Sequence, residues 1–266
     1  MSKASEEAQK QLDRIVALGY PDVADMSAAA FRSLARPLIR ALEDCGDEAG
    51  LGTQILLVPT RELVSPESLI ARTSINRMAG FTTMPPRDIA SFLPQDGFEP
   101  PEGPFYLVIE PHTGTCYINR EPDVARKLID SDERLPLTLE EGLAIATQHP
   151  EWLLEKNGFN LLGSRSADGR VPSIWMSQNA PRLGAVWPNS RHTWLGNACI
   201  AARTAVCGAT RGTVCGTARG TPCRTARFAA GRRDSAGPVA GRRHAARSAA
   251  RDFGCIAIRS VGAGNS

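Results

Sequence analysis

Apolar patterning ends near residue 198, and this limit constrains the fold more than any other feature of the 266-residue chain. From residue 207 the sequence drifts through the octamers CGATRGTV, CGTARGTP and CRTARFAA, and then becomes a run of Ala, Arg and Gly. A helix or strand needs apolar residues at a regular period to bury one face, and these octamers repeat only a cysteine. We therefore expect one main domain over residues 1–198 and a disordered, Arg/Ala/Gly-rich tail over residues 199–266.

The tail has two interpretations that the sequence leaves open. One is a frameshift product, because Arg, Ala, Gly, Thr and Pro without lysine are what GC-rich DNA yields when it is translated out of frame. The other is a genuine basic tail. Its twelve arginines and two aspartates give a charge of +10, which leaves −7 for residues 1–198 because the total is +3. Nucleic acid is expected only as a partner of the tail, since an acidic domain repels phosphates.

No segment has the pattern of a secreted or membrane protein. The opening MSKASEEAQKQLDRIV carries acidic residues where a secretory signal has a basic flank. The longest apolar runs, such as ILLV at 55–58, fall far short of the roughly 20 residues that span a bilayer. Only Cys45 and Cys116 precede residue 199, which favours reduced thiols. We expect a cytoplasmic protein without a membrane partner.

Five helices are expected. Two of them are the SPESLIAR segment, which Ser65-Pro66 opens, and the shorter PPRDIASFL, each with proline at its start. The other three carry further start or stop signals. Leu12 and Ile15 belong to an amphipathic stripe that stops at Gly19-Tyr20-Pro21. Ser27 is placed to cap a second helix, which Pro37 should kink or divide. A third begins at TLEEGLAIATQH, where Thr138 and the glutamate three residues later form a capping box.

The expected strands are short apolar runs bounded by turn formers. Residues 54–59, QILLVP, predict a buried strand. Residues 105–110 and 115–119 flank PHTG and predict a hairpin. Three later runs, FNLLG, PSIWMS and RLGAVW, predict further strands. Because helices gather early and strands late, we expect an α+β fold, with N-terminal helices and a mixed or antiparallel sheet.

Familiar catalytic and cofactor motifs are absent. The sequence contains no GxSxG, no HExxH, no GxxxxGK[ST] and no GxGxxG after a strand, so those mechanisms lose their usual support and the cofactor stays unknown. His112 and Cys116, with Cys199, suggest zinc-assisted thiol chemistry as a remote alternative, but no ligand pair of matching spacing follows. We expect no metal site.

Polar residues suited to recognition are densest between Gly163 and Gly196. Tryptophan faces beside guanidinium groups form either a packed structural layer or a pocket for a planar anion, and the sequence does not separate the two. Pairing of Arg165 or Arg170 with Asp168 is the structural alternative. The candidate ligand-binding residues are Arg165, Asp168, Arg170, Arg182, His192 and Trp194.

The same segment resembles an uncharacterised bacterial family of unknown function from high-GC genomes. The resemblance rests on GSRSADGRVPSIWMS, PRLGAVW and HTWLG, with LGYP, GFTTM and LTLEEGLAIATQHPEWL earlier in the chain. It covers roughly residues 8 to 196 and implies no activity. Members of the family end shortly after HTWLG, whereas this chain continues into the octamers, which supports the frameshift interpretation.

Three functions remain, in this order. The first is a small-molecule or anion-binding protein, with a small anionic ligand as its partner. The second is an enzyme that uses His192 or Asp168 as acid or base, which requires His192 beside a carboxylate in a concave pocket. The third is a structural interaction protein without a ligand site, which requires buried tryptophans and an apolar patch elsewhere.

Overall fold

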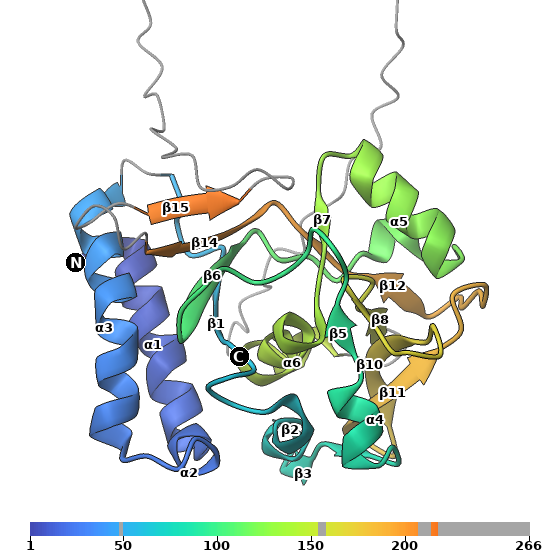
Figure 1. The fold of residues 1–266 in the computed structure, drawn as a ribbon, viewed down its shortest axis with the longest axis horizontal. Helices are drawn as coiled ribbons and strands as arrows, with labels where there is room; N and C mark the ends of the chain where they lie inside the picture. Colours follow the sequence, from blue (N-terminus) through green and yellow to red (C-terminus); the bar gives the residue numbers. More distant parts are fainter. Residues whose placement is uncertain (48–49, 154–157, 207–213, 218–266) are drawn as a thin grey trace, which may run out of the picture. The chain divides into compact units, whose positions relative to one another are not determined.

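Two buried strands, one at the edge and one next to it, form one side of the first sheet (Figure 1). The structure, a computed structural model, describes residues 1–47, 50–153, 158–206 and 214–217. Strand β1 (Ile55–Pro59) pairs antiparallel with β6 (Phe105–Ile109). Four residues at the start of β6 are buried, as is all of β1, which explains why neither strand alternates between apolar and polar residues. The sheet order is β1-β6-β14-β15.

The first sheet extends past the predicted domain boundary at residue 198. Strand β14 (Ala202–Val206) pairs with β6 on one side and with β15 (Val214–Thr217) on the other. Before it, β13 (Cys199–Ile200) pairs with β7 (Leu135–Pro136). The boundary predicted after residue 198 therefore falls among paired strands. The sequence did not indicate these strands, because main-chain hydrogen bonds keep them in the sheet although their side chains show no apolar period. Residues 207–213 and 218–266 of the predicted tail lie outside the described residues.

The predicted hairpin of residues 105–110 and 115–119 is wrong. Strand β6 pairs with β1 and β14, while residues 115–117 form the 3-10 helix η4 (Thr115–Tyr117). Gly114 enters η4 with φ +71°, and a Cβ there would lie 1.8 Å from the Asn197 carbonyl oxygen. The turn at PHTG therefore presses the chain against the strand at residues 195–197 instead of folding it back on β6.

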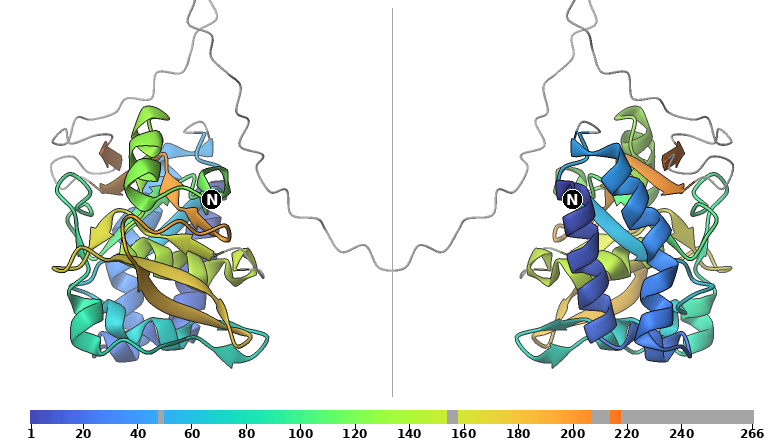
Figure 2. Two further views of the ribbon diagram at one scale, coloured as in Figure 1. Left: turned by 90° about the vertical axis from the view of Figure 1, so that its right-hand side faces the viewer. Right: turned by 90° about the vertical axis from the view of Figure 1, so that its left-hand side faces the viewer.

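Helices α1 (Lys3–Ala17) and α3 (Ala28–Cys45) lie side by side against the first sheet (Figure 2). The Ser27 hydroxyl accepts from the Ala30 N–H at 3.2 Å, which confirms the predicted cap. Pro37 does not divide α3, since it lies on the exposed face where water reaches the carbonyl that loses its partner. The Gln11 side chain bonds to the main chain of Ile55 and Leu57 and so occupies the free edge of β1.

Helix α6 (Leu139–Gln148) is the central element, and all ten of its residues are buried. It packs on β1 and on β10 (Val171–Ser177) of the second sheet. Gly142 permits this approach, because a Cβ there would lie 2.4 Å from the Leu161 side chain. The predicted capping box is confirmed, since the Glu141 carboxylate accepts from the Thr138 N–H at 2.8 Å.

Glu141 also pairs with Arg203, the only buried arginine among the described residues. Arg203 of β14 donates from Nε and Nη2 to the Glu141 carboxylate at 2.5 and 2.8 Å, and from Nη2 to the Pro136 carbonyl at 2.8 Å. The Tyr106 hydroxyl donates to the same carboxylate at 3.2 Å. A charge buried this deeply is tolerated only when it is paired and hydrogen-bonded, so β14 is integral to the core.

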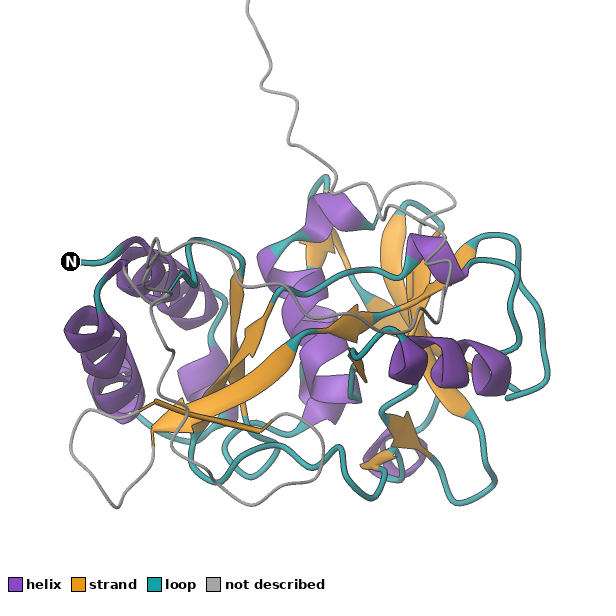
Figure 3. Ribbon diagram, turned by 90° about the horizontal axis from the view of Figure 1, so that it is seen from above, coloured by secondary structure: helices purple, strands orange, loops and turns teal. Residues whose placement is uncertain are grey.

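The second sheet has the order β12-β8-β10-β11-β4 and carries most of the conspicuous sequence motifs. Strand β10 pairs antiparallel with β11 (Ala180–Val186) and with β8 (Gly158–Asn160). The outer strands β12 (Leu195–Asn197) and β4 (Phe81–Thr82) are parallel to their neighbours, so the sheet is mixed. One face of this sheet packs on α6, and Figure 3 shows the two sheets with helix between them.

Further helices and strands complete the described structure. They are α2 (Tyr20–Val23), η2 (Pro66–Ser68), η3 (Ile70–Arg72), β2 (Ser74–Ile75), β3 (Met78–Ala79), α4 (Pro86–Ala90), β5 (Leu93–Pro94), α5 (Pro122–Ser131), η5 (Pro150–Trp152) and β9 (Ser164–Arg165). Strand β2 pairs with β3, and β5 pairs with β9. The α+β prediction with one main domain is confirmed. None of the described helices is long and apolar enough to cross a membrane.

Candidate functional site

The six predicted site residues fall into two groups in the structure. Arg165, Asp168 and Arg170 lie in β9 and in the turn that leads to β10. Arg182 lies on β11, while His192 and Trp194 precede β12. Among the described residues, no hydrogen bond, ion pair or ring contact joins the first group to the second. The six residues therefore do not form one cluster of contacts.

The turn group is held together by ion pairs. Arg165 pairs with Asp123 of α5 and donates from Nη1 to the Gly169 carbonyl at 3.1 Å. Arg170 pairs with Asp168 through Nε at 2.7 Å, which is the structural alternative expected from the sequence. The Ser166 hydroxyl and then Arg170 lower the pKa of Asp168, because both donate to the charged carboxylate. Both guanidinium groups are therefore already neutralised.

The sheet group is an aromatic layer around Arg182. Trp175 of β10 faces Arg182 in the pairing register, with the guanidinium carbon 5.4 Å from the indole centroid. Phe81 of β4 lies 5.7 Å from the same carbon, and Arg182 Nη2 donates to the Thr83 hydroxyl at 3.2 Å. Gly184 of β11 leaves room for the Trp175 indole, because a Cβ at this position would lie 2.2 Å from the ring.

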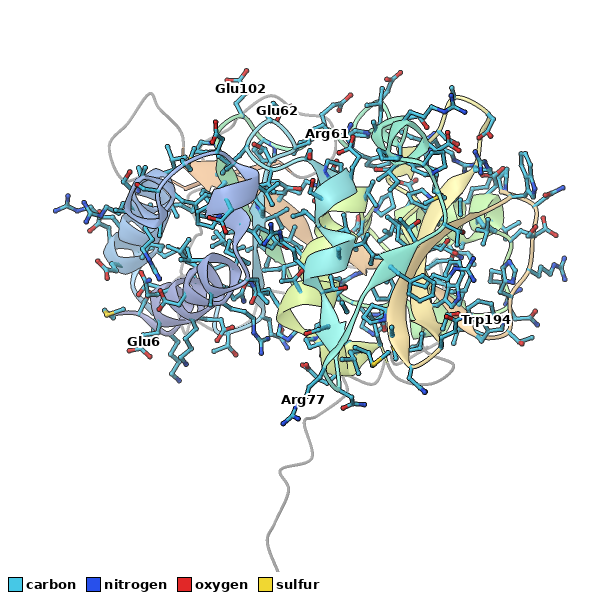
Figure 4. All side chains as sticks on the ribbon, turned by 90° about the horizontal axis from the view of Figure 1, so that it is seen from below. Glu6, Arg61, Glu62, Arg77, Glu102 and Trp194 are labelled. Carbon is cyan, nitrogen blue, oxygen red and sulfur yellow. The ribbon has the colours of Figure 1, made fainter. Side chains whose placement is uncertain are left out.

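His192 and Trp194 complete this layer at its edge. The two rings meet edge to face at 5.5 Å, and Trp194 meets Trp175 in the same way at 5.8 Å. Figure 4 shows Trp194 on the side of the molecule away from α1 and α3. His192 Nε2 is buried without a hydrogen-bond partner among the described residues. An acid–base role for His192 requires a neighbouring carboxylate, and none is hydrogen-bonded to its Nε2 within the described residues. The Asp168 carboxylate accepts instead from Ser166 and Arg170.

A pocket of about 560 Å³ lies beside α5, next to the turn group. It is within the usual size range of small-molecule sites. Asp123 links the pocket to the turn group, because it lines the pocket and pairs with Arg165. The lining residues come from α5, from β7 and the segment that leads to it, and from the loop after β5; they are Phe98, Asp123, Arg126, Lys127, Asp130, Arg134 and Pro136.

Two cations of this pocket have no carboxylate partner among the described residues. Arg126 is held by neutral groups, since it donates from Nη1 to the Gln95 side-chain oxygen at 2.8 Å and lies 4.8 Å from the centre of the Phe98 ring. Lys127 is exposed on the next position of α5 and makes no ion pair within the described part of the chain. A guanidinium oriented by neutral acceptors keeps its full charge available for an anion.

Arg134 is the third cation that lines the pocket. It donates from Nη2 to the Glu110 carbonyl at 2.6 Å and from Nε to the Cys199 sulfur at 3.2 Å, while the Glu110 carboxylate lies 3.5 Å from Nη1. Burial lowers the pKa of Arg134, but Cys199, Glu110 and Tyr117 together raise it by more, so the net pKa is raised. Arg134 is therefore a permanently charged, fixed donor at this position.

Sequence reasoning missed these pocket residues. The α5 segment PDVARKLIDS has the ordinary pattern of an amphipathic helix, with Ala125 and Ile129 buried and charges on the other side. Its only unusual signal is the adjacent Arg126-Lys127 pair, which does not reveal that Gln95 and Phe98 lie opposite. The pocket depends on segments about thirty residues apart that the fold brings together.

The structure gives no geometry for the zinc alternative. Within residues 1–47, 50–153, 158–206 and 214–217, no group of three or more His, Cys, Asp or Glu side chains is placed to hold a metal ion. His112 Nδ1 accepts instead from the Gly114 N–H at 2.9 Å. The main chains of His112 and Cys199 pair as an isolated bridge, which is a structural role.

Comparison with known proteins identifies the family but not the activity. The model of a family of unknown function, DUF5701, matches residues 14–206. The chain belongs to this family, in agreement with the resemblance found in its sequence motifs. The match ends at the last residue of β14, so the family domain includes the strand that carries Arg203. No curated protein and no solved structure matches the chain.

Proposed function

We propose that this member of the DUF5701 family binds a small organic anion in the pocket beside α5. The observation that carries the proposal is the presence of Arg126 and Lys127 in a pocket of ligand size without carboxylate partners in the described chain. The turn group contributes through one ion pair, because Arg165 pairs with Asp123 and so weakens the repulsion between that carboxylate and an anion.

Electrostatics favours an anion at this position. The pocket is lined by three cations and two carboxylates, and one of those carboxylates is neutralised by Arg165. This local excess of positive charge stands in a domain whose residues 1–198 carry −7. A cationic hollow in an acidic surface concentrates anions locally, since the field lines converge there.

The lining also indicates which anions fit. Arg126 and Arg134 present planar groups of N–H donors, which match carboxylate or phosphate oxygens better than a spherical ion. Phe98 and Pro136 add apolar contact area beside these donors. A carboxylate or phosphate attached to a small carbon skeleton therefore suits the pocket better than chloride or sulfate.

Thermal shift and calorimetry test the proposal with citrate, AMP and inorganic phosphate as probes. A ligand at a hundredfold excess over its Kd stabilises the folded state by about 2.7 kcal/mol, which corresponds to roughly 5–10 °C for a domain of this size. We expect citrate or AMP to raise the Tm of the wild type. Arg126→Gln with Lys127→Gln should abolish the shift.

The control double variant is Lys10→Gln with Arg87→Gln, which removes the same charge from exposed positions elsewhere. It should retain the shift. The proposal is wrong if no probe shifts the wild type, or if both double variants lose the shift equally. A shift lost in Arg182→Gln but kept in the α5 variant would move the site to the aromatic layer of the second sheet.

A further inference from the structure

Helix α3 carries an arginine at three successive turns. Arg32, Arg36 and Arg40 line a hollow of about 590 Å³ to which α1 also contributes. Figure 2 shows the two helices side by side in its right-hand view. Four residues of α-helix rise by about 6 Å, so the three arginine side chains leave α3 in a row with about that spacing. This surface is on different elements from the α5 pocket and does not depend on it.

Most of the positive charge in this row is unpaired. Arg32 pairs with Asp13 of α1 across the hollow. Arg36 and Arg40 are exposed and make no hydrogen bond or ion pair with any other described residue. Exposed arginines on a surface usually serve solubility, but here they stand in a row beside a hollow in a domain of net charge −7.

The floor of the hollow is apolar. Leu12 of α1 and Ile39 of α3 line it and are 2% and 8% exposed. The remaining lining residues are Gln9 and Glu43, and none of the lining residues is aromatic. Single-stranded nucleic acid is normally held by stacking on aromatic rings beside a basic groove, so this floor does not suit a nucleic acid.

Helix geometry suggests the occupant. Helices α1 and α3 are antiparallel, since the Ser2 hydroxyl at the start of α1 donates to the Leu42 carbonyl near the end of α3 at 2.8 Å. A third helix laid along such a pair places side chains four residues apart at the same spacing of about 6 Å as the arginines. Its acidic residues would then meet the arginine row while its apolar residues cover the floor.

We infer that the α1–α3 groove, defined by Gln9, Leu12, Arg32, Arg36, Ile39, Arg40 and Glu43, docks an acidic amphipathic helix of a partner protein. Charge complementarity selects the partner, because Arg36 and Arg40 make no ion pair with a described residue and Glu43 is the one carboxylate that lines the groove. Leu12 and Ile39 are too buried to add much contact area, so the arginine row carries most of the recognition in this helix-in-groove arrangement. The interaction goes beyond anion binding and uses a surface that the α5 pocket leaves free.

Fluorescence anisotropy with the full chain and two labelled peptides tests this inference. The first peptide is a 16-residue amphipathic helix with Glu at i, i+4 and i+8 and Leu on the opposite stripe. The second has Gln in place of each Glu. We expect the Glu peptide to bind, and Arg36→Gln with Arg40→Gln to weaken it by roughly tenfold, from two charge contacts of up to about 1 kcal/mol each.

The matched control is Arg87→Gln with Arg120→Gln, which changes the net charge equally at exposed positions outside the groove. This variant should bind the Glu peptide as the wild type does. Equal binding of the two peptides, equal loss in both double variants, or tighter binding of a dT12 oligonucleotide would each overturn the inference. So would a dimer, detected by light scattering, that Arg36→Gln with Arg40→Gln disrupts.

Discussion

Replacement of Arg203 by methionine tests whether β14 belongs to the core. In the wild type, Arg203 is 2% exposed at its side chain, and its partner Glu141 is 0% exposed. Removing one member of a buried ion pair leaves the other charge unpaired in an apolar environment and costs about 3–5 kcal/mol. For a domain of this size the loss corresponds to a fall in Tm of roughly 6–20 °C.

Two further variants identify the cause of the loss. Arg203→Met combined with Glu141→Gln should recover most of the stability, since it removes the stranded charge and keeps an acceptor for the Thr138 N–H. Arg170→Met breaks the more exposed pair with Asp168 and should cost at most about 1 kcal/mol.

Urea unfolding followed by circular dichroism measures all three variants. A cost below about 1 kcal/mol for Arg203→Met would refute the reasoning, because an unpaired Glu141 in the core cannot be that cheap. Truncation after Ala198 should be at least as damaging, since it removes both Arg203 and strand β14.

Three smaller tests concern local structure. Gly184→Ala should destabilise the second sheet by about 1–3 kcal/mol and shift the fluorescence of Trp175, because the added methyl overlaps its indole; unchanged emission and stability would contradict this packing. Ser27→Ala should cost about 1 kcal/mol through loss of the cap on α3, and a neutral result in urea unfolding would show that the cap contributes nothing. The pKa of every tyrosine is raised, and burial raises that of Tyr20 from 10.0 to about 12. Stability should therefore be full below pH 10 and decline towards pH 12, whereas phenolate absorbance at 295 nm near pH 10 in a folded protein would count against this burial.

The parts of the fold that follow local rules were predictable from the sequence. Helix α1 and helix α6 have an apolar stripe with a clear stop or a capping box, and both are where the pattern placed them. The run QILLVP became β1, and the runs PSIWMS and RLGAVW became the β10–β11 pair. In each case the residues that decide the structure are neighbours in the chain.

The errors arose where distant residues decide the structure. The segment ARTAV at residues 202–206 has no apolar period, so it was assigned to the tail. Its strand forms because β6 offers a free edge and because Arg203 finds Glu141, which is 62 residues away. The predicted hairpin failed for a related reason, since Gly114 packs on the main chain of Asn197.

The candidate site shows the same division. For the segment from Gly163 to Gly196, the sequence left two alternatives: a packed structural layer or a pocket for a planar anion. The pairing of Arg170 with Asp168, which the structure shows, belongs to the structural alternative. It did not indicate the α5 pocket, because Arg126 acquires its orientation from Gln95 and Phe98 in another segment. Charge excess in a pocket is a property of the folded chain and is not visible in a local motif.

A nuclear magnetic resonance titration of the labelled full chain with citrate tests the anion pocket most directly. We predict saturable shifts of the Arg126 side-chain Nε–H signal and of the Lys127 and Phe98 amides, with the indole signals of Trp175 and Trp194 unmoved. Shifts confined to those two indoles, or no saturable shift at Arg126, would contradict the proposal that the α5 pocket binds an anion.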